Sequence, residues 1–152
     1  MKTNFERLRV YQLAEKLADR IWKVVIKWDY FAKATLGQQI VDAVDGVGAN
    51  IAEGTGRGSL QDNRRFVKIA RGSLYETKHW LRRAYKRNLL TEQEVCDLKP
   101  LIDELVPTLN AYFRSLNEAI EQRRQRTKYK AQSSKFDART QTDNKTLRRC
   151  AG

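Results

Sequence analysis

The sequence predicts an all-α protein, folded as an antiparallel, up-down-up-down four-helix bundle. Apolar residues recur at helical spacing in four successive segments, and no strand-like alternation interrupts them. Only two prolines and eight glycines occur in 152 residues, so long helices can form. Helices joined by short loops favour antiparallel packing, and a hydrophobic content of 41% is enough for one core.

The first two predicted helices end at clear breaks. In the first, the apolar pattern stops near residues 29–31; its apolar positions are Val10, Ala14, Leu17, Ile21, Val24 and Trp28. The second ends in the glycine-rich stretch 53–58; its apolar positions are Leu36, Ile40, Val44, Val47 and Ile51. Gly46 and Gly48 each cost this helix about 1 kcal/mol relative to alanine, which the close approach of a neighbouring helix would explain.

The third and fourth predicted helices start at capping boxes. Ser59 with Asp62 opens the third, which ends near Asn88, and Thr91 with Glu94 opens the fourth. The inner positions of the third are Phe66, Ala70, Leu74 (or Ser73), Thr77, Leu81 and Ala84. Those of the fourth are Val95, Leu98, Ile102, Leu105, Leu109, Tyr112, Leu116 and Ala119. Because this heptad keeps its phase across Pro100 and Pro107, we expect one kinked helix, with two helices meeting near Pro100 as the alternative.

The charge distribution predicts two regions, a bundle at 1–122 and a basic disordered tail at 123–152. The tail holds ten Lys or Arg and two Asp, a net charge of +8 out of +12 for the chain. It has few large apolar residues with which to form a core, although the fourth helix could extend into it for a turn or two.

The sequence shows no targeting or membrane segment. No apolar run reaches the roughly 18 to 20 residues that cross a bilayer, and the N-terminus lacks an apolar signal core. We therefore expect a cytoplasmic protein with no membrane partner. Cys96 and Cys150 lack metal-ligand spacing and are expected to be free thiols.

Catalytic and metal-binding patterns are weak, so we expect no enzyme, no cofactor and no metal. Glu76 and His79 have the spacing of a di-iron ligand pair, but such a site needs two of these motifs and the chain has one histidine. Asp42, Asp45 and Glu53 could hold a metal for a nuclease, although a solvated or ion-paired face is the favoured interpretation. Residues 53–58 lack the lysine of a phosphate-binding loop.

A basic face on the third helix is the main functional signal. Glu76 is the only acidic residue from Arg64 through Arg87, and Tyr75, Trp80 and Tyr85 could stack on unpaired bases. The candidate nucleic-acid-binding residues are Arg57, Arg64, Arg65, Lys68, Arg71, Lys78, Arg82, Arg83, Lys86 and Arg87.

Two segments carry a resemblance to a known family. NIAEGTGR at 50–57 followed by IARGSLYE at 69–76, with VYQLA at 10–14 and LGQQI at 36–40, resembles the 23S rRNA intervening-sequence proteins over roughly residues 8–120. The resemblance implies a left-handed four-helix bundle that assembles as a homopentamer. It also implies kinship with the accessory protein of diversity-generating retroelements, a basic pentamer that binds nucleic acid and a reverse transcriptase. It supplies no catalytic residues.

The residues of this motif also have structural interpretations, which we favour over a ligand site. Asn50 could cap a helix or bond between helices, and Glu53 could pair with Arg57 or Arg71. Gly54 would end the second helix. Gly72 and Ser73 are small enough to permit a close helix contact.

The sequence therefore predicts a non-enzymatic accessory protein that binds RNA or DNA through the basic face of its third helix. The alternative is an assembly or adaptor protein whose partner is another protein, possibly a reverse transcriptase. A nuclease is the third and weakest alternative, because no catalytic constellation is apparent.

Overall fold

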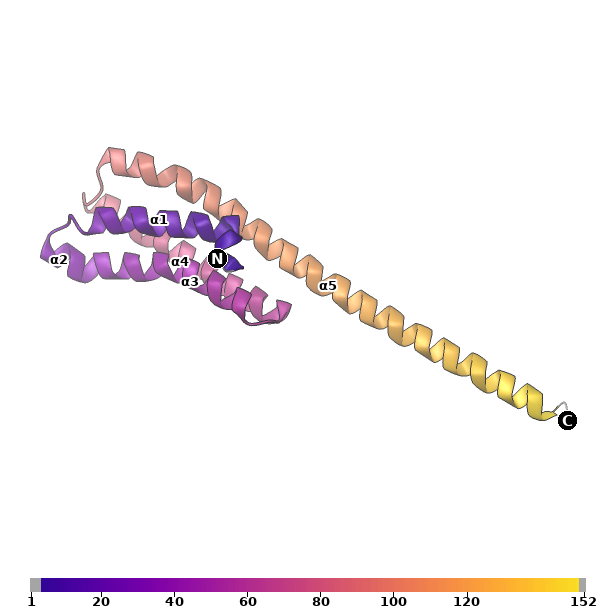
Figure 1. The fold of residues 1–152 in the computed structure, drawn as a ribbon. Coiled ribbons are helices and arrows are strands. Elements are labelled where there is room, and N and C mark those ends of the chain that lie inside the picture. The colour runs from indigo at the N-terminus through magenta and orange to yellow at the C-terminus, as the bar shows by residue number, and fades with distance from the viewer. Residues whose placement is uncertain (1–3, 151–152) are drawn as a thin grey trace. The chain divides into compact units, whose positions relative to one another are not determined.

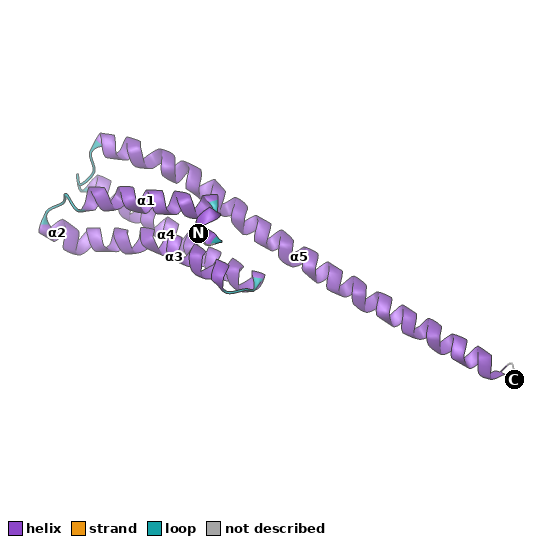
Figure 2. Cartoon of the chain, viewed as in Figure 1, coloured by secondary structure: helices purple, strands orange, loops and turns teal. Residues whose placement is uncertain are grey.

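The computed structural model describes residues 4–150, without the side chains of residues 137, 138 and 140–150. All regular secondary structure in this part of the chain is helical (Figure 2). The chain divides into two compact units, Met1–Leu116 and Asn117–Gly152, and each is described by itself.

The first unit is a helical bundle in which α1, α3, α4 and the start of α5 lie side by side (Figure 1). The elements in chain order are a 3₁₀ turn Phe5–Arg7, α1 Arg9–Val25, α2 Tyr30–Ala32, a π-helical turn Lys33–Gly37, α3 Gln38–Gly56, α4 Leu60–Lys86 and α5 Glu92–Cys150.

The core contains the apolar positions that the periodicity predicts. All six predicted positions of the first helix and all five of the second are buried, as are Phe66, Ala70, Leu74, Thr77, Leu81 and Ala84 of α4. Thr77 is the one polar member, and its hydroxyl donates to the Ser73 carbonyl at 2.8 Å, which removes the cost of burying it.

The break predicted near residues 29–31 is the start of α2. The Asp29 side chain caps this helix by accepting a hydrogen bond from the Ala32 amide at 3.0 Å. The π-helical turn then connects α2 to α3, so the chain stays helical from Tyr30 to Gly56.

Small residues allow α3 to approach its neighbours closely. A Cβ added at Gly46 would lie 3.1 Å from Ser73 Oγ on α4, and one at Gly54 would lie 2.8 Å from the Phe66 Cβ. Gly48 lies against α1, where an added Cβ would meet the Tyr11 ring at 3.6 Å. The close helix contact inferred from Gly46 and Gly48 is therefore present.

Both ends of α4 are fixed by capping interactions. At its start, Ser59 Oγ accepts from the Asp62 amide at 3.1 Å. At its end, Asn88 has a φ of 58°, its amide donates to the Tyr85 carbonyl, and the Leu89 amide donates to the Ala84 carbonyl. These two bonds form a Schellman motif, which is why Asn88 ends the helix.

The start of α5 is a complete capping box. The Thr91 amide donates to Glu94 Oε2 at 3.0 Å, and the Glu94 amide donates to Thr91 Oγ1 at 3.1 Å. Pro100 and Pro107 lie inside one uninterrupted helix, at exposed positions, as the unbroken heptad phase predicts. Leu98, Leu105, Leu109 and Leu116 are buried.

The second unit continues as helix through Cys150, whereas the sequence predicts a disordered tail from residue 123. The helix has a physical basis, because this segment is rich in Arg, Lys, Gln and Ala and has no proline, and its one glycine is Gly152. The side chains described from 123 to 136 are all exposed, so propensity rather than packing supports it. Residues 151 and 152 of the predicted tail lie outside the described residues.

Two glycine variants test the packing. Gly54→Ala should lower the free energy of unfolding by about 1–3 kcal/mol, because its Cβ would overlap the Phe66 Cβ and the Asn63 side chain. Gly72→Ala is the matched control: a Cβ there meets nothing within 4 Å, so better helix propensity should raise stability by about 1 kcal/mol. Urea unfolding of the two variants measures both values, and equal effects would contradict the packing described.

Candidate nucleic-acid interface

Most basic residues of α4 lie at the surface of the bundle, and Arg64 and Arg71 are half-buried. Its apolar face is buried in the core, so the opposite face lies at the surface of the first unit. On a helix of 3.6 residues per turn, six basic residues fall within an arc of about 80°. This basic stripe comprises Arg64, Lys68, Arg71, Lys78, Arg82 and Lys86.

The middle of the basic stripe rests on an aromatic side chain of α5. The Phe113 ring lies beneath Lys68 Nζ, at 5.9 Å, and beneath the Arg71 guanidinium, at 5.2 Å. Such contacts orient a cation without neutralising it. Phe113 is absent from the sequence prediction; its only signal is that it follows the heptad position Tyr112.

The remaining predicted basic residues lie outside the basic stripe. Arg83 and Arg87 are exposed and lie about 100–140° around the helix from it. Arg57 and Arg65 lie over the Phe66 ring at 5.1 and 4.5 Å. Each of these two also pairs with a carboxylate, Arg57 with Glu53 and Arg65 with Asp62, so they add less positive potential than the stripe does.

Two of the three predicted stacking residues are available on the surface. Tyr75 and Tyr85 are 54% and 53% exposed, and Tyr75 occupies the gap in the stripe between Arg71 and Lys78. Trp80 instead packs against the core, with its indole N–H donating to Glu76 Oε1 at 3.2 Å. An unpaired base could therefore stack on Tyr75 or Tyr85. Trp80 is less available, because part of its ring packs against the core.

Carboxylates gather on a different part of the bundle. Asp45 lies with Glu15 and Asp19 along a groove of about 310 Å³ between α1 and α3. Partial desolvation, and then the negative charges of Asp42 and Asp19, raise the pKa of Asp45 above its usual value. Negative charge is thus concentrated at the α1–α3 groove and positive charge on α4.

The residues considered for catalysis do not form a site. The Glu76 carboxylate bonds to Trp80, while the exposed His79 ring meets the Trp80 ring edge-on at 4.9 Å between centroids. Among the described residues, no three His, Cys, Asp or Glu gather as metal ligands would. Cys96 is a free, exposed thiol. In the same part of the chain, no helix is long and apolar enough to cross a membrane.

The motif residues of the two signature segments make structural contacts. Asn50 Nδ2 donates to the Gly46 carbonyl at 2.6 Å within α3, and Glu53 pairs with Arg57 rather than Arg71. Gly54 is buried against α4, whereas a Cβ at Gly72 would meet nothing within 4 Å in the described chain. The close helix contact expected of Gly72 and Ser73 therefore involves Ser73 alone.

Comparisons with known proteins identify the family. The profile of the 23S rRNA-intervening sequence proteins matches residues 6–111, about 70% of the chain. A crystal structure described as a protein of unknown function from the S23 ribosomal protein family of Bacteroides thetaiotaomicron superposes with a TM-score of 0.61 at 21% identity, covering 69% of this chain and 95% of that one. No curated protein matches the sequence.

The kinship with the accessory protein of diversity-generating retroelements stays a prediction. The structural likeness shows a shared fold, and the sequence profile covers most of the bundle from the 3₁₀ turn to α5. The chain belongs to the 23S rRNA-intervening sequence protein family.

Proposed function

We propose that this protein is a non-enzymatic accessory protein that binds RNA or DNA through the basic face of α4. The observation that carries the proposal is the charge of one helix surface. From Arg64 to Arg87 there are nine Lys or Arg, six of which form the basic stripe, and a single acid, Glu76, whose carboxylate is engaged with Trp80. Concentrated cations of this kind attract phosphates and release their counterions.

The dimensions of the basic stripe suit a nucleic-acid backbone. From Arg64 to Lys86 the helix rises about 33 Å, which is close to one turn of a duplex. Lys68 and Arg71 on Phe113 are held partly ordered before binding, which lowers the entropy lost on contact with phosphates. Tyr75 offers an unpaired base a stacking surface in the gap between the phosphate contacts. The family name makes RNA the first probe to use.

A matched pair of double variants tests this interface. Arg83→Gln with Lys86→Gln should weaken binding of a labelled single-stranded RNA roughly tenfold, because two exposed phosphate contacts are lost. The control, Arg20→Gln with Lys23→Gln, removes the same charges from exposed positions of α1 and should change the affinity much less. Fluorescence anisotropy at one fixed salt concentration measures both.

Equal losses in the two double variants would show that only total charge matters, and would contradict an interface on α4. Repeating the titration with DNA of the same sequence shows whether the 2′-hydroxyl contributes to recognition.

We also propose that the four helices run up-down-up-down and that the protein assembles as a homopentamer. An ion pair joins Arg9, at the start of α1, to Glu104 of α5, and another joins Lys27, just after α1, to Glu94 near the start of α5. The two helices therefore run in opposite directions, which supports the antiparallel order. Exposed apolar side chains at the α1–α2 end support self-association, since monomers seldom leave such groups in water. They are Trp22, Ile26, Tyr30 and Phe31.

Molar mass in solution tests the assembly. Light scattering should give five times the chain mass of 17.7 kDa, and Tyr30→Ser with Phe31→Ser should shift the protein toward smaller species. These two side chains are 84% and 76% exposed, so the double variant should not disturb the fold of one chain. A mass of one chain at micromolar concentration would contradict the pentamer. The reverse-transcriptase partner stays a prediction.

A further inference from the structure

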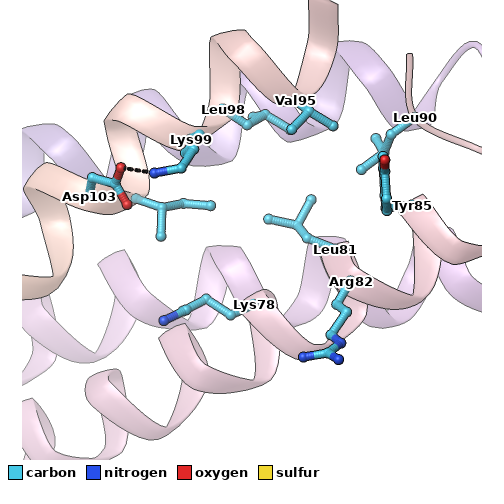
Figure 3. A pocket seen from close by; sticks show the side chains of 10 residues that line it. Lys78, Leu81, Arg82, Tyr85, Leu90, Val95, Leu98, Lys99 and Asp103 are labelled. Atoms are coloured by element: carbon cyan, nitrogen blue, oxygen red, sulfur yellow. Dashed lines mark hydrogen bonds and ion pairs between the residues drawn. The ribbon is translucent and has the colours of Figure 1, made fainter. Parts of the chain in front are cut away.

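A second feature of α4 lies where this helix faces the first turns of α5. A cavity of about 330 Å³ opens there, within the first unit (Figure 3). Leu81 and Leu98 form its base and are 8% and 3% exposed. Leu90, Val95 and Ile102 form its walls and are half-buried.

The cavity lies beside the apolar stripe of α5. Val95 and Ile102 occupy the same apolar stripe as Leu105 and Leu109, which are 0% and 1% exposed. At the cavity, Val95 and Ile102 are only half-buried, so part of this apolar stripe faces open space. Burying apolar surface is worth about 25 cal/mol per Å², so an apolar group that fills this space gains affinity.

The rim of the cavity carries uncompensated positive charge. Lys99 and Asp103 form an ion pair with each other, so their charges cancel (Figure 3). Lys78 and Arg82, on the opposite side, pair with no carboxylate among the described residues; the Lys78 ammonium lies 5.7 Å from the Tyr75 ring. An apolar cavity with two free cations at its edge fits an apolar group accompanied by anions.

The lining favours an aliphatic or aromatic protein side chain over a nucleobase. A base presents donors and acceptors along its edge that must be matched when it is buried. The floor of this cavity is formed by the apolar side chains of Leu81 and Leu98. Tyr85 contributes one of the few polar groups of the lining. A Leu, Phe or Trp side chain has no such requirement and can fill the space as an anchor residue does.

We infer that this cavity is a docking site for an acidic amphipathic segment of a partner protein. One apolar side chain enters between Leu81 and Leu98, and carboxylates of the same segment bind Lys78 and Arg82. These two cations are four residues apart, about one helical turn, so two Glu four residues apart on a helical partner match them. The cavity adjoins the proposed nucleic-acid interface, and the two share Lys78 and Arg82.

The probe is a fluorescein-labelled, alanine-rich synthetic helix with one Trp between two Glu four residues apart. Two variants fill the cavity without changing charge, Val95→Phe and, in the loop before α5, Leu90→Phe. Each should weaken peptide binding at least tenfold while leaving RNA affinity within twofold of the parent protein. Thermal unfolding of both variants verifies folding, and having two variants keeps the test usable if one is unstable.

A charge-reversed variant tests the rim. Lys78→Glu with Arg82→Glu should abolish binding of the acidic peptide, whereas the matched control, Arg124→Glu with Lys128→Glu in the second unit, should retain it. A peptide with Ser in place of Trp should bind at least tenfold more weakly than the probe.

Two results would overturn the inference. One is peptide binding that neither filling variant weakens. The other is RNA affinity that falls tenfold in Val95→Phe, since the cavity would then hold a base. Failure of the proposed function would give a different result: the parent protein would bind RNA weakly and still bind the peptide.

Discussion

The close packing of α3 against α4 determines what the rest of the molecule can do. At Gly54, an added Cβ would overlap the Phe66 Cβ, and at Gly46 it would make a tight contact with Ser73 Oγ. These contacts fix how far α4 is rotated about its own axis. Because core residues interdigitate without slack, a rotation of even one residue step would bury cations of the basic stripe. The surface chemistry of α4 is thus a consequence of two glycines on its neighbour.

That rotation gives a single helix two different surfaces. Beside the core, α4 and α5 leave an apolar cavity between Leu81 and Leu98, and farther out α4 presents the basic stripe. Carboxylates gather in the α1–α3 groove, where desolvation, and then the charges of Asp42 and Asp19, raise the pKa of Asp45. Under the proposed function, this separation of charge would attract a polyanion to one face and repel it from the other. Lys78 and Arg82 belong to both surfaces of α4, so a nucleic acid and an acidic partner would compete for them.

Local sequence patterns predicted the helices, their caps and most of the core, because heptad spacing and capping boxes depend on residues within a few positions of each other. Features that depend on residues far apart in sequence were not predictable. Phe113 of α5 lies beneath Lys68 and Arg71 of α4, and the cavity is lined by residues of both helices. The small size of Gly72 predicts a close helix contact, but a Cβ added there would meet nothing within 4 Å. A small residue permits a close contact without determining which residue lies opposite it. In the tail, the scarcity of large apolar residues predicts disorder, whereas the segment is helical through Cys150, in keeping with its helix propensity.

The central claim is that cations on α4 bind nucleic acid by neutralising phosphates. The most direct test is the affinity of the whole chain for a single-stranded RNA, measured across a series of salt concentrations. If about five phosphates are neutralised, the logarithm of the association constant should fall with the logarithm of salt concentration with a slope of about −3.5. An affinity that does not change with salt would contradict the account, because binding would then not depend on the charge that α4 displays.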